Sequence, residues 1–270
     1  MGRLHLAEIE DQPWCPRSLR DGLTDYLGFM LERFSPYAGA VPLLVRLLDR
    51  LGEGRIVDLC SGGGGPWPDL VRRLQAVHRP VHVRLTDYYP NRAAFARLRQ
   101  RSRGALETWD EPVDAAAVPR EFVGLRTLFT AFHHFRPEVA RHILADAVRQ
   151  RRGIAVFEAT SRSPIAVAGM PIFALGVLLF APFIRPFRWS RLIWTYLFPV
   201  LPLAIWFDAT VSCLRTYTRA ELREMADHLD ADGYEWEIGT LRAWPLLTPL
   251  TYLIGCPPGS LAARPGYQRA

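Results

Sequence analysis

The segment RIVDLCSGGGG, at residues 55–65, is the strongest indication of the fold in this sequence. A short apolar run ends in four consecutive glycines, which is typical of a strand that runs into a tight turn. Glycines let the backbone turn sharply and approach a ligand with no side chain in the way. Taken alone, the glycine run is also compatible with a plain flexible turn.

Outward from this segment, short apolar runs alternate with stretches of helical periodicity. Strands are predicted at residues 55–60, 81–86, 105–109, 123–130, 153–158, 233–239 and 251–256. Helices are predicted at residues 69–77, 92–101 and 137–149, with a capping-box pattern at Thr218 and Glu221 opening a later helix. The alternation predicts an α/β fold: a Rossmann-like, mostly parallel sheet with helices on both faces and an N-terminal helical extension.

The composition excludes several classes of enzyme. The chain has 270 residues with a formal net charge of +6, and it contains no lysine. A Walker-type phosphate loop, a protein kinase and a pyridoxal-phosphate enzyme each need a lysine, and so does the catalytic pair of short-chain dehydrogenases. The positive charge on its own only weakly suggests nucleic acid or an anionic membrane as a partner.

The cysteines and the N-terminus indicate a cytoplasmic protein. Cys15, Cys60, Cys213 and Cys256 form no CxxC pair, and no His/Cys cluster has the spacing of metal ligands. We therefore expect free thiols in a reducing cytosol and no metal. The first residues contain no apolar segment of the kind that a signal peptide requires.

An acid at the end of the second predicted strand indicates what the glycine loop binds. Asp87 follows the glycine cluster by about two dozen residues, as the ribose-binding acid does in nucleotide-binding sheets. A carboxylate there can accept hydrogen bonds from both hydroxyls of a ribose. The loop and the acid together predict a site for an adenosine nucleoside.

With these motifs, residues 50–160 and 208–256 resemble the class I S-adenosylmethionine (SAM)-dependent methyltransferase superfamily. The first motif of that family runs acid, x, Gly, x, Gly, x, Gly, and residues 58–64 read DLCSGGG, with Cys60 in place of the first glycine. Three further segments match in the same order, EPVDA at 111–115, HHFRP at 133–137 and TYTRAEL at 216–222. The resemblance implies an enzyme that uses SAM to methylate an acceptor.

The resemblance also implies roles for individual residues at the cofactor. Gly62 and Gly64 would line the methionine part of SAM, Asp87 would hold the ribose, and Asp114 would lie near the adenine amino group. Cys60 and Asp58 complete the predicted cofactor-binding set. Two alternatives stay open, because Asp58 could support the loop through backbone amides, and Asp114 could be a loop acid or helix cap.

Three residues are the candidates for catalysis. His133 and His134 follow the fourth predicted strand, at the edge where open α/β sheets place their ligands. Positioning supplies much of the rate of an in-line methyl transfer, and a histidine could serve as base for a protonated acceptor. Alternatively, one histidine packs beside SAM and the other satisfies a backbone group. Glu158, which ends the fifth predicted strand, could be a base or the partner of an arginine.

An apolar insertion follows the fifth predicted strand. Residues 163–184 carry no charge, an arginine-rich link follows at 185–191, and residues 192–207 are apolar but interrupted by Pro199 and Pro202. One interpretation is a hairpin that lies on the cytoplasmic face of an anionic membrane or dips into it. The other is a buried cap over the active site. Both favour a hydrophobic acceptor.

These inferences divide the chain into four parts. Residues 1–50 form a helical cap, 51–161 and 208–256 the SAM-binding domain, 162–207 the insertion, and 257–270 a disordered tail. We expect a cytoplasmic methyltransferase, peripheral on the membrane under the first interpretation, that acts on a hydrophobic or lipid-like small molecule. The fourth strand lacks the Asn/Asp-Pro-Pro-aromatic segment of amino-methylating DNA enzymes, so nucleic acid is not the expected acceptor. The alternatives are a soluble small-molecule methyltransferase with an apolar lid, and a non-catalytic SAM-binding protein at a membrane.

Overall fold

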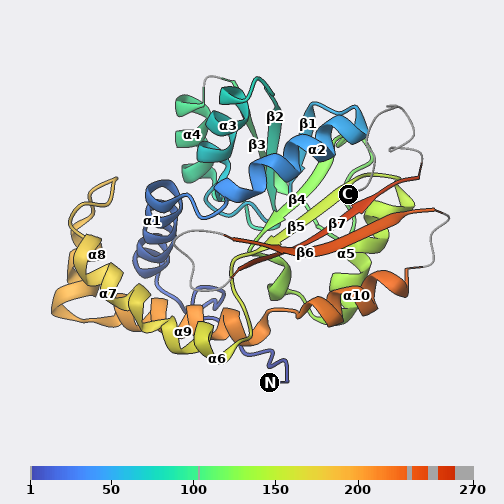
Figure 1. Ribbon diagram of the computed structural model, residues 1–270. Helices are drawn as coiled ribbons and strands as arrows, with labels where there is room; N and C mark the ends of the chain where they lie inside the picture. The colour runs from blue at the N-terminus through green and yellow to red at the C-terminus, as the bar shows by residue number, and fades with distance from the viewer. Residues whose placement is uncertain (1, 103, 230–232, 243–248, 259–270) are drawn as a thin grey trace.

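A seven-stranded sheet forms the centre of the computed structural model, which describes residues 2–102, 104–229, 233–242 and 249–258 (Figure 1). The strands are β1 (Arg55–Asp58), β2 (His82–Asp87), β3 (Leu106–Pro112), β4 (Leu125–Phe129), β5 (Ile154–Glu158), β6 (Glu235–Leu241) and β7 (Leu250–Cys256). Their order is β3-β2-β1-β4-β5-β7-β6, and β1 to β5 pair in parallel while β7 runs antiparallel to both of its neighbours. The predicted Rossmann-like, mostly parallel sheet is confirmed.

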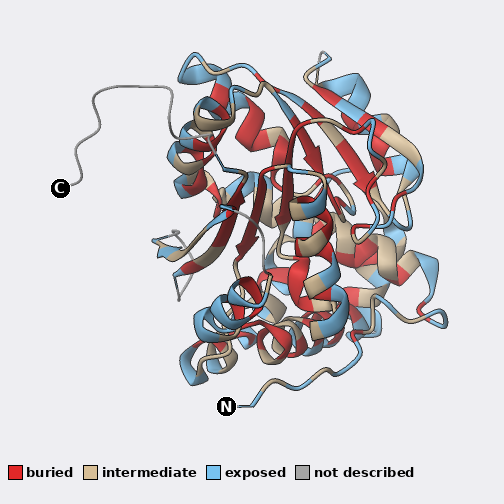
Figure 2. Cartoon of the chain, turned by 90° about the vertical axis from the view of Figure 1, so that its right-hand side faces the viewer, coloured by how far each residue is buried: buried red, intermediate tan, exposed pale blue. Residues whose placement is uncertain are grey.

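Helices cover both faces of this sheet, as predicted, because successive strand residues point to opposite sides. Ile56 packs in the apolar layer beneath α2 (Val41–Leu51), α3 (Trp67–Ala76) and α4 (Arg92–Arg101). The next residue, Val57, packs in the opposite layer, beneath α5 (Pro137–Arg149) and α10 (Arg219–Asp227). The capping box predicted for the last of these helices is present, with Thr218 and Glu221 bonding reciprocally. Figure 2 shows that the central strands are mostly buried, whereas the edge strands β3 and β6 are largely intermediate or exposed.

The strand order creates a crevice at one edge of the sheet. From β1 the chain winds outward through β2 to β3, and then returns to place β4 on the other side of β1. Ligands of open α/β sheets bind at such a reversal point, beyond the carboxyl ends of the strands. The loops that follow β1, β2, β4 and β5 therefore meet at the edge where a ligand is expected.

A separate helical layer lies beside this edge, at the lower left of Figure 1. It consists of α1 (Arg17–Phe34), α6 (Pro164–Gly169), α7 (Pro171–Phe180), α8 (Trp189–Leu192), the π-helical turn η3 (Ile193–Leu197) and α9 (Val200–Arg215). Leu23 and Tyr26 of α1 share a buried cluster with Val177 of α7 and Leu201 of α9. The segment after β5 thus packs on the N-terminal helix.

The structure refines the two apolar stretches predicted after β5. The first divides into α6 and α7, and the second bends sharply near Pro199, between η3 and α9. Pro202 does not interrupt the second stretch, because it lies in the first turn of α9, where its missing N–H costs nothing. Within the described residues, no helix on its own has the length and apolar character to cross a bilayer. The pair Trp189–Leu197 and Val200–Arg215, bent by 83°, meets that test only when the two are taken together.

Two of the three arginines in the link between the apolar stretches are paired within the protein, so they do not support the interpretation of a hairpin on an anionic membrane. Arg191 is fully buried and its guanidinium lies 2.9 Å from the carboxylate of Asp25 on α1. Arg188 bonds to the same carboxylate at 2.8 Å and pairs with Asp21 at 3.2 Å. Only Arg185 of the three is exposed. Charge in a sequence does not reveal whether a carboxylate on another helix already neutralises it.

Other predicted boundaries shift by a few residues. The third strand extends to Pro112, because it pairs with β2 through an irregularity as far as Asp87. Most of the tail predicted to be disordered, from residue 259 onward, lies outside the described residues.

Candidate ligand site at the carboxyl edge of the sheet

The glycine loop after β1 has a backbone conformation that residues with a side chain rarely adopt. Gly62 and Gly64 have φ angles of 53° and 105°, and a Cβ on Gly64 would clash with the side chain of Leu98 on α4. Cys60, where the superfamily motif has its first glycine, also lies in the left-handed region, with φ of 58°. A non-glycine residue there costs roughly 1–2 kcal/mol. Cys60 therefore adopts the left-handed backbone conformation that normally favours glycine.

Asp58 holds this loop from beneath. Its buried carboxylate accepts hydrogen bonds of 2.7 Å from the hydroxyls of Ser61 and of Thr127 on β4. Burial raises the pKa of Asp58 to about 6, although the two hydroxyls work in the other direction. The expected supporting role fits this geometry, with the difference that its donors are hydroxyls rather than backbone amides.

Asp87 connects the end of β2 to the glycine loop. One carboxylate oxygen accepts a hydrogen bond of 2.8 Å from the Gly62 N–H, and the other accepts one of 2.8 Å from the Tyr89 N–H. Each oxygen of a carboxylate can accept a second hydrogen bond. Asp87 can therefore keep the loop in place and still accept both hydroxyls of a ribose.

The remaining cofactor candidates lie around the same point. The Val113 N–H donates to the main-chain oxygen of Asp87 at 2.9 Å, which holds the exposed Asp114 beside the β2 end. The carboxylate of Asp114 accepts from the Ala116 N–H at 2.8 Å, a local turn. Burial raises the pKa of the Cys60 thiol, and the carboxylates of Asp87, Asp58 and Asp114 raise it further. The structure thus brings the predicted cofactor set together.

Helix α1 lies over the glycine loop. A Cβ on Gly63 would come within 3.0 Å of the Thr24 methyl group, so that side of the loop faces protein. The hydroxyl of Thr24 donates to a carboxylate oxygen of Glu10 at 2.9 Å. Helix α1, which belongs to the segment predicted to be a helical cap, therefore covers one side of the loop.

The catalytic candidates meet beyond the ends of β4 and β5. His133 is 1% exposed, and its Nδ1 lies 2.7 Å from one carboxylate oxygen of Glu158. The other Glu158 oxygen accepts a hydrogen bond of 2.8 Å from the Phe132 N–H. Burial lowers the pKa of His133, but the carboxylates of Glu158 and Glu8 outweigh burial and raise that pKa to about 9. The partner of Glu158 is therefore His133, and the alternative in which Glu158 pairs with an arginine is wrong.

Glu8 is the member of this group that the sequence analysis missed. Its two carboxylate oxygens lie 3.7 Å from the Nε2 atoms of His133 and of His134. The Ser212 hydroxyl donates to Glu8 at 2.9 Å, and Arg215 lies 3.3 Å away. Burial raises the pKa of Glu8, and the two imidazoles with Arg215 more than offset it, so the net shift is downward.

The N-terminal segment reaches this position by binding along α9. The carboxylate of Asp208 accepts hydrogen bonds from the Ile9 and Glu10 N–H groups, at 2.6 and 3.1 Å. Nearer the terminus, Arg3 donates to the main-chain oxygens of His133 and Phe135 at 3.0 and 2.8 Å. The segment therefore covers the loop after β4. His134, whose side chain is 33% exposed, remains the histidine that a ligand can reach.

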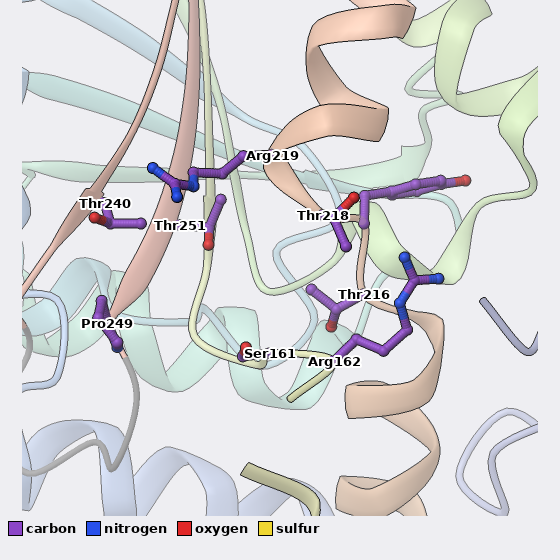
Figure 3. Close-up of a pocket in the computed structure, with 9 residues that line it drawn as sticks. Ser161, Arg162, Thr216, Thr218, Arg219, Thr240, Pro249 and Thr251 are labelled. Atoms are coloured by element: carbon purple, nitrogen blue, oxygen red, sulfur yellow. The ribbon is translucent and has the colours of Figure 1, made fainter. Parts of the chain in front are cut away.

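A separate hollow of about 200 Å³ lies where α9 meets α10 and the β6–β7 edge (Figure 3). Its walls carry hydroxyl and guanidinium groups, including Ser161, Arg162, Thr216, Thr218 and Thr251. The predicted cofactor and catalytic residues do not line it. The carboxyl edge of β1, β2 and β4 is the better candidate site, because the loop conformation and the convergent acids are there.

The fold and this edge together define an α/β protein with a Rossmann-like sheet and a candidate ligand site at its carboxyl edge. No family model matches the chain, and no curated protein does. Solved structures that it resembles include the CMeT domain of a citrinin polyketide synthase, with a TM-score of 0.49 and 14% identity over 80% of this chain and 51% of that one. Human N-acetylserotonin methyltransferase in complex with SAM gives 0.49 and 12% over 89% and 56%. Magnesium protoporphyrin IX methyltransferase from Synechocystis PCC 6803 with bound SAM gives 0.46 and 10% over 84% and 83%.

The chain spans about half the length of the first two of these structures. Similarity this distant concerns the arrangement of the sheet alone. The function has to come from the residues of the site.

Proposed function

We propose that this chain binds SAM at the carboxyl edge of β1 and β2 and transfers its methyl group to an apolar small molecule. The observation that carries the proposal is the glycine loop, left-handed at Cys60, Gly62 and Gly64 and bonded through the Gly62 N–H to Asp87. It lies at the reversal point of the sheet, where a nucleoside is expected. The motifs that resemble those of the class I superfamily indicate that this nucleoside is SAM.

The strand order favours a single nucleoside over a dinucleotide. A dinucleotide fold is built from two adjacent parallel halves, each of which binds one mononucleotide. Here β3-β2-β1 forms one such half, but the antiparallel β7 separates β5 from β6 in the other. This arrangement supports SAM and disfavours NAD.

The group around His133 forms the acceptor end of the proposed site. Glu158 and His133 are buried and bonded to each other, so we assign them a positioning role. With its pKa raised to about 9, His133 carries its proton at neutral pH and is not a free base. His134 is partly exposed, and we propose that it is the residue that contacts the acceptor.

An exposed apolar surface supports the choice of acceptor. Most of the large hydrophobic side chains exposed in the described residues fall between Ile165 and Phe207. Leu179, Phe183, Trp189 and Leu197 are each at least 66% exposed. A soluble monomer rarely exposes apolar surface on this scale, and a fully buried cap does not account for it. We propose that this surface contacts a lipid bilayer, chiefly through apolar and aromatic side chains, because Arg188 and Arg191 are paired internally.

The proposal is tested by incubating the chain with methyl-labelled SAM and a total lipid and metabolite extract. Label is expected in an apolar product, with release of S-adenosylhomocysteine. The His134→Gln variant is expected to lose most of this turnover, while the His142→Gln variant, altered at an exposed histidine of α5, retains it. SAM binding without release of S-adenosylhomocysteine in any extract would contradict the enzymatic role.

A further inference from the structure

Three side chains at the acceptor end have the arrangement of metal ligands. One ligand atom from each of Glu8, His133 and His134 can be chosen so that all three lie within 4.8 Å of one another. We propose that these residues bind one divalent transition-metal ion. The site unites the N-terminal segment with the loop after β4, so the spacing of residues along the chain does not reveal it.

The distances fit a metal better than they fit hydrogen bonds. Each Nε2 atom lies 3.7 Å from a carboxylate oxygen of Glu8, which is too long for a hydrogen bond. Two ligands that each bind zinc at about 2.1 Å lie about 3.4 Å apart at a tetrahedral angle. The three ligand atoms lie within 4.8 Å of one another, so the side chains would have to approach one another by up to about 1.4 Å to coordinate one ion.

The other nitrogen of each imidazole is already held by a carboxylate. Nδ1 of His133 lies 2.7 Å from Glu158, and Nδ1 of His134 lies 3.3 Å from Asp11. Metal-bound histidines usually have such a partner, which fixes the ring and directs the lone pair of the opposite nitrogen at the metal. Both rings thus present Nε2 to the same carboxylate, that of Glu8.

The Nε2 atom of His133 provides an independent sign of a missing ligand. It is buried and finds no hydrogen-bond partner among the described residues. A buried polar atom without a partner is costly, and native structures usually supply one. A proton shared loosely with Glu8 is the competing occupant, since protons and metals compete for imidazole nitrogens.

The local charge also suits a cation. Arg215 pairs with Glu8 and Asp11, Glu158 is bonded to His133, and Arg3 donates to the main-chain oxygen of His133. Metal binding would release the proton that His133 carries at neutral pH, and with both imidazoles then neutral, three negative and two positive charges leave one net negative charge. Arg215, 3.3 Å from Glu8, would have to yield part of that contact to the metal.

The ligand set selects among metals. Two imidazoles and one carboxylate suit zinc, iron, manganese or cobalt, whereas magnesium and calcium prefer oxygen ligands. Three protein ligands leave at least one coordination position for water or for an oxygen of another molecule. A role for that position in activating a methyl acceptor would rest on the proposed function, but metal binding itself does not.

The test is a titration of the full, tag-free chain with Co²⁺ after treatment with a chelator, followed by visible absorption and calorimetry. We expect one equivalent to bind. His134→Gln and Glu8→Gln are expected to abolish this binding, and Glu158→Gln to weaken it by about 10- to 100-fold. His142→Gln should bind as the unaltered chain does.

Two results would overturn the assignment: no stoichiometric binding, or equal binding by the His134→Gln variant. His134 is partly exposed, so its variant remains informative if Glu8→Gln fails to fold. SAM binding is measured on the same samples. Retained SAM binding without cobalt binding would refute only the metal site, and cobalt binding without SAM binding would refute only the proposed function.

Discussion

Replacing Asp87 with alanine is expected to weaken SAM binding by on the order of 2–3 kcal/mol, or about 30- to 150-fold in Kd. The structure gives the origin of this magnitude. Both carboxylate oxygens accept backbone N–H groups at 2.8 Å, and each keeps one lone pair for a ribose hydroxyl. Hydrogen bonds to a charged group contribute about 1.5–3 kcal/mol each when buried. Because Asp87 is partly exposed, each ribose contact contributes about 1–1.5 kcal/mol, which gives the total of about 2–3 kcal/mol.

The substitution also releases the Gly62 N–H, so the glycine loop has to be ordered again when the ligand binds. Asp87→Asn separates the two effects, because its amide oxygen still accepts one hydrogen bond while its NH₂ group cannot accept any. We expect this variant to lose about half of the binding free energy lost by Asp87→Ala. The assay is isothermal titration calorimetry with SAM.

Asp227→Ala provides the matched control, because it removes an exposed carboxylate on α10, away from the glycine loop. It should bind SAM as the unaltered chain does. The reasoning would be refuted if Asp87→Ala left Kd unchanged. It would also be refuted if Asp227→Ala weakened binding as much as Asp87→Ala, because the effect would then be one of net charge.

Three further predictions follow from the loop and from the apolar surface. Cys60→Gly should keep the fold and SAM binding. The Cys60→Val variant should have a free energy of unfolding about 1–2 kcal/mol lower than that of the Cys60→Gly variant, because a branched Cβ is disfavoured at positive φ. Equal denaturation midpoints for the two variants would contradict this. Burial raises the pKa of Asp58 to about 6, above its value in the unfolded chain, so its contribution to stability is present at low pH and is lost as the pH rises from about 4 to 6. The stability of the unaltered chain relative to Asp58→Asn should then fall by up to about 3 kcal/mol over that range, and a constant difference in urea denaturation would exclude the effect. The double variant Leu179→Ser, Trp189→Ser should bind liposomes about 30-fold more weakly, by roughly 2 kcal/mol of lost apolar burial, with little dependence on salt. Val77→Ser, altered at the exposed apolar residue that follows α3, should have no effect, and equal pelleting of the two variants would refute the assigned surface.

The sheet could be predicted because its signals are local. The apolar runs that became β1 and β5 end in Asp58 and Glu158, and each is bounded by glycines or polar residues within a few positions. The glycine loop and Asp87 follow from short-range spacing in the same way. The Gly62 N–H donates a hydrogen bond to Asp87 and so joins the loop to the acid. This contact is possible because β1 and β2 are neighbours in the parallel sheet.

The acceptor end could be predicted only in part. His133, His134 and Glu158 follow strands, so their common edge was foreseeable, and the structure places the first and last in direct contact. Glu8 was not foreseeable, because its position depends on how the N-terminal segment binds to Asp208 on α9. The pairing of Arg191 with α1 is equally non-local. Neither contact can be predicted from residue type or periodicity.

Calorimetry with three ligands determines whether the glycine loop and Asp87 hold SAM. We expect SAM and S-adenosylhomocysteine to bind at one site per chain with similar affinity, since both carry the same nucleoside. We expect no measurable binding of NAD, because β7 separates β5 from β6. Binding of NAD in the absence of SAM binding would show that this edge of the sheet is not a SAM site.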